Sequence, residues 1–230
     1  MEAMTYKQYV LVTGGSGGIG SAVSKMCPSF GFTPIIGFKS NAEEANILAK
    51  EINGLAVQID MSDVNSILNA IEIITKEIGT SGNLVAVVLG ASPPPALEPF
   101  LKISNEQLSN QLNVNLIGPK ILLQILIKSF FKKNKTGTIV GVLTEAIGSI
   151  DRPPATGMGS YVIAKIALKG MLSICSTEYP WLKIKTISPG FTKTPMLDVF
   201  DQRYLEMVHA RTPILAPEEV ATDIMNQIVS

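Results

Sequence analysis

The chain has 230 residues, of which 46% are hydrophobic and only 17% charged, and its 19 basic residues balance its 19 acidic residues. A chain this apolar can bury a sizeable core, which excludes intrinsic disorder. The lack of excess positive charge excludes the usual nucleic-acid and membrane-surface binders.

Short apolar runs alternate with longer helical patterns along the whole chain. The apolar runs, typical of strands buried on both faces, are residues 9–12, 33–38, 55–59, 84–89, 137–143 and 182–187. Helical spacing of apolar residues predicts helices over residues 19–30, 42–52, 64–78, 106–133, 160–178 and 217–228. Strands that alternate with helices indicate right-handed crossovers and a parallel sheet. We therefore predict an α/β fold with one doubly wound, Rossmann-type sheet in a single domain over residues 1–230.

A glycine-rich turn joins the first strand to the first helix. Gly15, Gly17 and Gly20 satisfy the spacing G-x-G-x-x-G, while Gly14, Gly18 and Gly20 satisfy T-G-x-x-x-G-x-G. Residues without a Cβ let the backbone approach a pyrophosphate, and the helix N-terminus presents free N–H groups to the phosphates. The turn therefore predicts dinucleotide binding, and a glycine-rich loop without a ligand is the alternative.

The end of the second strand bears on which dinucleotide binds. NAD sites place an acidic residue there to hold the ribose hydroxyl, but this chain has no acid until Glu43, inside the next helix. Lys39 stands in that region and can meet a 2′-phosphate, which favours NADP(H) over NAD(H), although a solvated loop lysine explains it equally. Asp60 ends the third strand, where it either contacts the adenine or begins the turn before Asp63.

Tyr161 and Lys165 are four residues apart in a predicted helix and therefore share one of its faces. A free tyrosine with a pKa of about 10 is a poor acid or base at neutral pH. A nearby ammonium group favours the phenolate, so we expect Lys165 to lower the pKa of Tyr161. The pair predicts an acid/base for interconverting a carbonyl and an alcohol.

With these motifs in order, the sequence resembles the short-chain dehydrogenase/reductase family from about Val10 to about Ile228. The matching positions are Thr13, Gly14, Gly18, Ile19 and Gly20 in the glycine turn, Asn115 in the long helix, Tyr161 with Lys165, and Thr194 within residues 188–195. The resemblance implies an NAD(P)-dependent oxidoreductase of a small carbonyl or alcohol substrate.

The resemblance also implies a role for each of four catalytic positions. Tyr161 is the general acid in reduction, Lys165 lowers its pKa and holds the nicotinamide ribose, and Asn115 completes a proton relay through a water. Thr144 provides the hydroxyl that polarises the substrate carbonyl. The implied cofactor positions are Gly14, Ser16, Gly18, Ile19, Gly20, Lys39, Asp60, Met61, Gly90, Ala91, Tyr161, Lys165, Pro189, Gly190, Thr192 and Thr194.

The chain departs from the family pattern at four places. Thr144 replaces the usual serine and is followed by the charged Glu145, and the segment from Thr144 to Tyr161 is longer than usual. The usual Asn-Ala-Gly appears as residues 90–92 with the sequence Gly-Ala-Ser, so we expect the bracing by the asparagine to be lost. The family's last strand is missing, leaving six main strands, so we expect a homodimer and leave a tetramer open.

Other features of the sequence bear on the substrate-binding part of the site and on the cellular location of the protein. Residues 191–211 are expected to form a small lid over the substrate. Cys27 and Cys175 lie far apart, which fits reduced cytoplasmic thiols and neither a metal site nor a disulfide framework. Residues 1–9 lack the apolar segment of a secretory signal, and residues 121–127 are too short to span a membrane.

Two alternatives from other functional classes stay open. A non-catalytic nucleotide-binding sensor or scaffold is consistent with Thr144, Glu145 and the missing last strand. A dehydratase or epimerase that cycles a bound nucleotide is the other. The lysines at the end of the long helix (Lys128, Lys132, Lys133 and Lys135) either complement the helix dipole or dock an acidic carrier protein.

Overall fold

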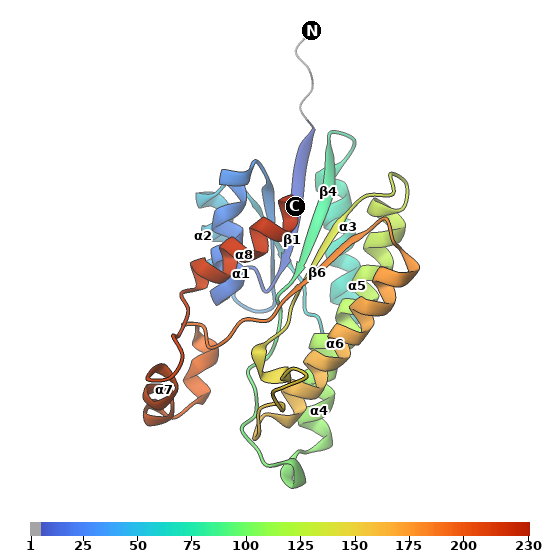
Figure 1. Cartoon of the computed structure of the whole chain (residues 1–230). Helices are drawn as coiled ribbons and strands as arrows, with labels where there is room; N and C mark the ends of the chain where they lie inside the picture. Colours follow the sequence, from blue (N-terminus) through green and yellow to red (C-terminus); the bar gives the residue numbers. More distant parts are fainter. Residues whose placement is uncertain (1–5) are drawn as a thin grey trace.

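A six-stranded parallel sheet forms the centre of the computed structural model, which describes residues 6–230 (Figure 1). Residues 1–5, part of the segment predicted to lack a secretory signal, lie outside the described residues. The strands are β1 (Lys7–Thr13), β2 (Thr33–Phe38), β3 (Leu55–Gln58), β4 (Gly82–Leu89), β5 (Thr138–Val142) and β6 (Lys183–Ile187). Their order, β3-β2-β1-β4-β5-β6, is that of dinucleotide-binding sheets and confirms the predicted Rossmann-type fold.

Helices cover both faces of this sheet, as the alternating pattern predicts. The main helices are α1 (Gly18–Met26), α2 (Ala42–Glu51), α3 (Val64–Ile78), α4 (Asn105–Leu112), α5 (Gly118–Leu126), α6 (Gly159–Glu178), α7 (Gln202–His209) and α8 (Pro217–Val229). The predicted helix over residues 19–30 is shorter than expected, because α1 gives way to a 3₁₀ turn at Cys27–Phe30, where Pro28 supplies no N–H.

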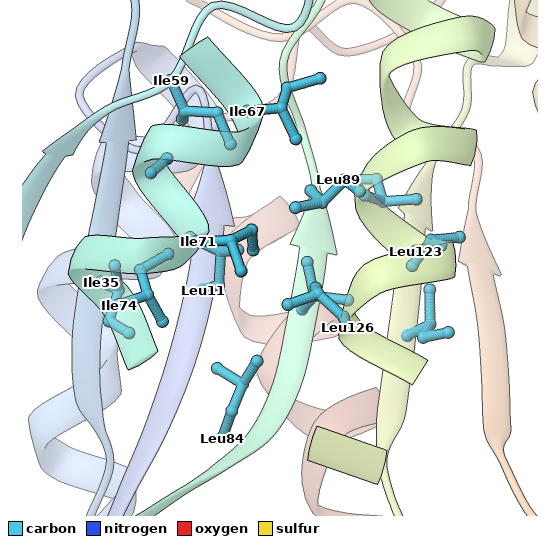
Figure 2. Close-up of a cluster of buried hydrophobic side chains, with 14 of the residues drawn as sticks. Leu11, Ile35, Ile59, Ile67, Ile71, Ile74, Leu84, Leu89, Leu123 and Leu126 are labelled. Carbon is cyan, nitrogen blue, oxygen red and sulfur yellow. The ribbon is translucent and has the colours of Figure 1, made fainter. Parts of the chain in front are cut away.

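Two hydrophobic layers hold the helices against the sheet. Figure 2 shows the layer in which α3 and α5 cover one face, with Ile71 and Leu126 packed over Leu11 and Leu84 of the strands. The neighbouring strand residue Val10 points to the other face, where it packs with α1 and α8. Each fully buried aliphatic side chain of this kind contributes about 1.5–3 kcal/mol, so the sheet is a rigid support for its loops.

The long predicted helix forms as one continuous helical stretch over Asn105–Phe131. By length and composition it could cross a membrane, but half of its most apolar window is buried inside this chain. Leu122, Leu126 and Phe131 pack in the core, which accounts for its apolar character. The stretch contains two π-turns, Asn113–Ile117 and Ile127–Phe131, which the apolar spacing does not predict.

The chain leaves the sheet at the carboxyl ends of the strands to build a second region. Figure 1 shows α7 and α4 extending beyond this same end of the sheet. The 3₁₀ turn Pro195–Val199 and α7 fall within residues 191–211. Parallel α/β sheets bind ligands at this end, so a ligand site is expected there.

Candidate active site

The glycine turn connects β1 to α1 in a conformation that only glycine accepts easily. Gly14 has φ = 68°, a left-handed conformation, and the N–H of Gly15 donates to the carbonyl oxygen of Gly37 at 2.8 Å. A Cβ at Gly20 would collide with the carbonyl oxygen of Gly14. The turn therefore packs directly against the start of α1, where free N–H groups can meet phosphate oxygens.

Thr13 ties the end of β1 to the end of β4. Its hydroxyl donates to the carbonyl oxygen of Val88 at 3.3 Å and accepts from the N–H groups of Gly90 and Ala91 at 3.1 and 3.2 Å. No asparagine stands at this place, as the sequence already shows, and the Thr13 hydroxyl joins the two strand ends through backbone groups of Val88, Gly90 and Ala91.

Lys39 and Asp60 form an ion pair at the end of the sheet, with Nζ and Oδ2 3.0 Å apart. The other carboxylate oxygen of Asp60 accepts from the N–H and the hydroxyl of Ser62 at 2.8 and 2.6 Å. Burial alone raises the pKa of Asp60, but the hydrogen bonds from Ser62 and Lys39 outweigh it and lower the pKa. Asp60 thus begins the turn before Asp63 and also holds Lys39 at the predicted sugar end.

The tyrosine–lysine pair lies on α6 and is almost fully buried, with Tyr161 7% and Lys165 2% exposed. The Nζ of Lys165 lies 5.7 Å from the centre of the Tyr161 ring and donates to the carbonyl oxygen of Val142 at 2.9 Å. Burial lowers the pKa of Lys165 to about 7. A buried lysine that gives up its proton so easily provides little fixed positive charge.

The expectation that Lys165 lowers the pKa of Tyr161 is not met in this structure. Burial raises the pKa of Tyr161, and a hydrogen bond with Thr144 acts in the opposite direction without outweighing it. The physical reason is that burial destabilises the phenolate more than the contact with Thr144 stabilises it. The protonated phenol is therefore the stable form, as a general acid requires.

Thr144 places its hydroxyl beside Tyr161 directly after β5. Its oxygen accepts from the N–H of Ala146 at 3.2 Å, as the cap of the short 3₁₀ turn Glu145–Ile147. An oxygen that accepts from the backbone keeps its own proton for another acceptor. The threonine hydroxyl can therefore donate a hydrogen bond into the cavity that it lines.

Glu145 and Arg152 pair at the wall of the same site. A nitrogen of Arg152 lies 3.7 Å from the Glu145 carboxylate, and another donates to the Glu145 carbonyl oxygen at 2.8 Å. The Glu145 N–H donates to the carbonyl oxygen of Pro189 at 2.9 Å, and its carboxylate lies beside Gly190. The unusual charge next to Thr144 is thus offset by the long segment that follows it.

Three aromatic rings of residues 191–211 pack together over the site. Phe200 and Tyr204 stack at 5.7 Å between ring centres, and Phe191 meets Phe200 edge to face at 5.4 Å. His209 accepts a long hydrogen bond from the N–H of Ile214 and does not line the cavity. The aromatic cluster forms an apolar wall of the cavity that Tyr161 and Lys165 also line.

These groups surround one cavity of about 310 Å³. Of the predicted site residues it brings together Ile19, Gly90, Thr144, Tyr161, Lys165, Pro189, Gly190, Thr192 and Thr194. The glycines of the turn, Ser16, Lys39, Asp60, Met61, Ala91 and Asn115 lie outside its lining. Gly18 still connects to it, because a Cβ there would strike the side chain of Thr194. Among residues 6–230, no group of three or more potential ligand side chains could hold a metal.

Asn115 is buried behind the cavity in the first π-turn. Its amide nitrogen donates to both the carbonyl oxygen and the side-chain oxygen of Gln111, at 3.2 and 3.0 Å. Pro119 stands four residues later and has no N–H for the carbonyl oxygen of Asn115, which breaks the regular helix at this point. Gln111 and Pro119 were missed, although the proline inside an apolar helical pattern is a visible signal.

Comparisons with known proteins identify the family of the chain. A family model described as short chain dehydrogenase matches residues 8–204. A 3-oxoacyl-acyl-carrier-protein reductase (FabG) of Thermotoga maritima is 28% identical, with 94% of this chain and 87% of that protein covered. A benzil reductase of Bacillus cereus is 25% identical, with 82% and 77% covered.

A solved structure supports the fold itself. The 3-ketoacyl-acyl-carrier-protein reductase of Brucella melitensis, in complex with NADH, superimposes with a TM-score of 0.84 at 20% identity, over 97% of this chain and 91% of that one. Since the family model spans most of the described chain, the chain belongs to the short-chain dehydrogenase/reductase family, a family of NAD(P)-dependent oxidoreductases.

Proposed function

We propose that this protein is an NADP(H)-dependent reductase of an apolar ketone or aldehyde, with Tyr161 as general acid, or the catalyst of the reverse oxidation. The observation that carries the proposal is that Thr144, Tyr161 and the buried Lys165 line one cavity, with the Lys165 Nζ 5.7 Å from the centre of the Tyr161 ring. Two hydroxyl donors that converge on one point can hold a single carbonyl oxygen.

The chemistry follows from these donors. The reduced nicotinamide supplies a hydride to the carbonyl carbon when it is bound. Tyr161 donates its phenolic proton to the carbonyl oxygen, which gains negative charge as the double bond breaks. Thr144 donates a hydrogen bond to the same oxygen, and such a donor in a dry site stabilises the charge by about 2.7–4 kcal/mol.

The dinucleotide itself fits the glycine turn. Gly14 and Gly20 pack so closely against neighbouring backbone that neither has room for a Cβ, and this lets the turn fold tightly at the N-terminus of α1. Residues 189–194 line the cavity on the side of the predicted nicotinamide. Lys39, with its side chain 62% exposed at the sugar end, supports NADP(H) over NAD(H). The NADH of the Brucella structure keeps NAD(H) as the second possibility.

The cavity supports an apolar substrate of moderate size. Beyond the reacting groups its walls are mainly Met158, Phe191, Met196, Leu197 and Phe200. The relatives' names mention 3-oxoacyl chains and benzil, both carbonyl compounds with apolar parts. The lysines near residues 128–135 do not favour a carrier protein at this site, because they precede β5 and so lie at the opposite end of the sheet.

The remaining expectations belong to the same proposal. Ile163, Ile166 and Ile174 of α6 stay 39%, 46% and 63% exposed, an apolar stripe that a second copy of the chain would cover in a homodimer. A cytoplasmic location agrees with the unpaired Cys27 and Cys175. We propose residues 191–211 as the lid of a single domain.

The test compares Tyr161→Phe with wild type on a panel of apolar ketones and aldehydes. Loss of the proton donor should lower kcat by about 100- to 10,000-fold, while the Kd of NADPH stays within about twofold. Tyr6→Phe, at a side chain that is 65% exposed directly before β1, is the matched control and should keep full turnover. Full activity of Tyr161→Phe would end the proposal.

The same assay addresses the alternative classes. If the wild-type protein binds NADPH but does not oxidise it in the presence of any carbonyl compound of the panel, the result would favour the non-catalytic sensor or scaffold. Product without net change of the nucleotide would favour a dehydratase or epimerase.

A further inference from the structure

The cavity contains a pair of charged side chains that the proposed reaction does not use. Among the lining residues, all within the described part of the chain, only Glu145, Arg152 and Lys165 carry an acidic or basic side chain. Lys165 acts with Tyr161 in the proposed reaction, whereas Glu145 and Arg152 have no part in it. Their side chains are 48% and 55% exposed, so a ligand that enters the cavity can reach them.

The two side chains keep unused hydrogen-bonding groups next to each other. The guanidinium group of Arg152 is rich in N–H donors, and it gives one of them to the backbone carbonyl oxygen of Glu145 at 2.8 Å. Its contact with the Glu145 carboxylate is an ion pair, whose 3.7 Å between nitrogen and oxygen is too long for a hydrogen bond. The pair therefore leaves donors on Arg152 and lone pairs on the Glu145 carboxylate for a ligand.

The backbone that carries Arg152 is closed on itself, which holds this residue at the cavity. The N–H of Ser149 donates to the carbonyl oxygen of Arg152 at 2.8 Å, and the N–H of Ala155 donates to that of Ala146 at 2.9 Å. Gly148 turns the chain with φ = 75°, and a Cβ there would collide with the carbonyl oxygen of Arg152. Because this backbone is already ordered, a ligand that binds here loses less entropy in ordering it.

Glu145 is held through its own backbone and directly follows Thr144. The Glu145 N–H donates to the carbonyl oxygen of Pro189 at 2.9 Å. The Glu145 carbonyl oxygen accepts from the N–H of Gly148 at 3.1 Å as well as from Arg152. The charged pair thus shares a wall of the cavity with the hydroxyl that is proposed to polarise the substrate carbonyl.

The two opposite charges select the class of group that fits between them. A carboxylate of the substrate would be attracted by Arg152 but repelled by Glu145, and an ammonium group would meet the reverse conflict. A neutral group that both accepts and donates, such as a hydroxyl or an amide, can accept from Arg152 and donate to Glu145.

We propose that Glu145 and Arg152 form a specificity subsite for a neutral hydroxyl or amide group of the substrate, apart from its reacting carbonyl. The inference rests on the proposed function and deepens it. The substrate is then an apolar carbonyl compound that also carries one such polar group.

The experiment compares two series of ketones as substrates of the wild-type protein. One series consists of straight-chain 2-ketones of about five to ten carbons, lengths that suit a cavity of about 310 Å³, and the other carries a hydroxyl on the last carbon. At the best length, kcat/KM of the hydroxyketone should exceed that of the plain ketone about tenfold. Arg152→Met and Glu145→Met each remove one partner of the hydroxyl, so each should lower this ratio to about threefold or less.

A third series, with a carboxylate on the last carbon, tests the charge argument. The wild type should not prefer these oxo acids to the plain ketones. Glu145→Met leaves the charge of Arg152 without its counterion, so this variant should gain a preference for the carboxylate of about tenfold over wild type.

Controls separate the inference from folding and from the proposed function. Each preference is a ratio within one protein, so a general loss of folding or turnover does not change it. Lys50→Met and Glu51→Met, at exposed positions of α2 outside the cavity lining, should keep the wild-type ratios.

Three results would overturn the inference: a wild-type ratio near one at every length, a ratio that stays unchanged in Arg152→Met, or a wild-type preference for the terminal carboxylate. A wild type that turns over neither the plain ketones nor the hydroxyketones also overturns it. The comparison of Tyr161→Phe with wild type on the panel of carbonyl compounds then decides the proposed function separately.

Discussion

Lys39 and Asp60 face each other at the ends of β2 and β3, with 3.0 Å between the ammonium nitrogen and a carboxylate oxygen. The two residues are separated by 20 others in the sequence, and nothing in the sequence shows that they pair. The pair holds the Lys39 ammonium group at the point where the adenosine ribose of a dinucleotide is expected. A substitution of Lys39 can therefore test the proposed preference for NADP(H) over NAD(H).

Lys39→Ala should raise the KM for NADPH about tenfold and leave the KM for NADH within about twofold. The reason is that a charge-assisted hydrogen bond to a phosphate contributes about 1.5–3 kcal/mol, reduced here because the lysine is exposed. Steady-state kinetics with both nucleotides measures it, with the exposed Lys25→Ala of α1 as control. A preference of the wild type for NADH would remove the argument.

Lys165 should make the folded protein more stable as the pH rises from about 7 to 9. Its folded pKa of about 7 lies below its ordinary value of 10.5, so the unfolded chain binds more protons in this range. The free energy of unfolding then rises with pH by up to about 1.4 kcal/mol per unit. Above pH 9 the buried Cys27, with its pKa raised to about 12, acts in the opposite direction.

Urea unfolding of wild type and Lys165→Met across this pH range tests that prediction. The methionine variant lacks the titrating group, so the difference in unfolding free energy between the two proteins should change with pH. Parallel curves would show that Lys165 keeps its ordinary pKa in the folded protein.

Thr144→Val should lower kcat about 100-fold, whereas Thr144→Ser should stay within about threefold of wild type. Valine keeps the shape of the side chain but loses the donor to the carbonyl oxygen. It also loses the hydrogen bond that lowers the pKa of Tyr161, so the pKa of that phenol rises further. Single-turnover kinetics measures both variants, and equal rates for valine and serine would exclude a role for the hydroxyl.

Thr13→Val should lower the free energy of unfolding by about 1–3 kcal/mol. The substitution leaves the N–H groups of Gly90 and Ala91 without their acceptor in a partly buried place. Thr13→Ser, which keeps the hydroxyl, should restore most of the loss. Equilibrium denaturation checks this, and a valine variant as stable as wild type would mean that water replaces the hydroxyl.

Much of the fold is predictable because parallel strands that are buried on both faces have continuous apolar sequences. The runs at 33–38 and 84–89 predict β2 and β4 to within two residues. Tyr161 and Lys165 are equally visible, since their spacing puts them on one turn of one helix. Contacts between distant segments are not visible, and these include Gln111 with Pro94 and Arg152 with Glu145.

The sign of the Tyr161 pKa shift also escaped prediction, for a physical reason. Spacing shows that a lysine is near, but not that both groups are buried so deeply that desolvation dominates. The amount of water around a charge is a property of the assembled packing. No pair of residues in a sequence reports it.

The far wall of the cavity comes from the two segments that depart most from the sheet, residues 145–158 and 191–211. Neither contributes a strand to the six-stranded sheet. Substitutions at their cavity-lining positions that do not pack against Tyr161 or Gly18, such as Met196 and Leu197, can change which molecule fits. Directed evolution of the cavity-lining positions in these two segments can therefore change the substrate range while Tyr161 and Lys165 keep their places on α6.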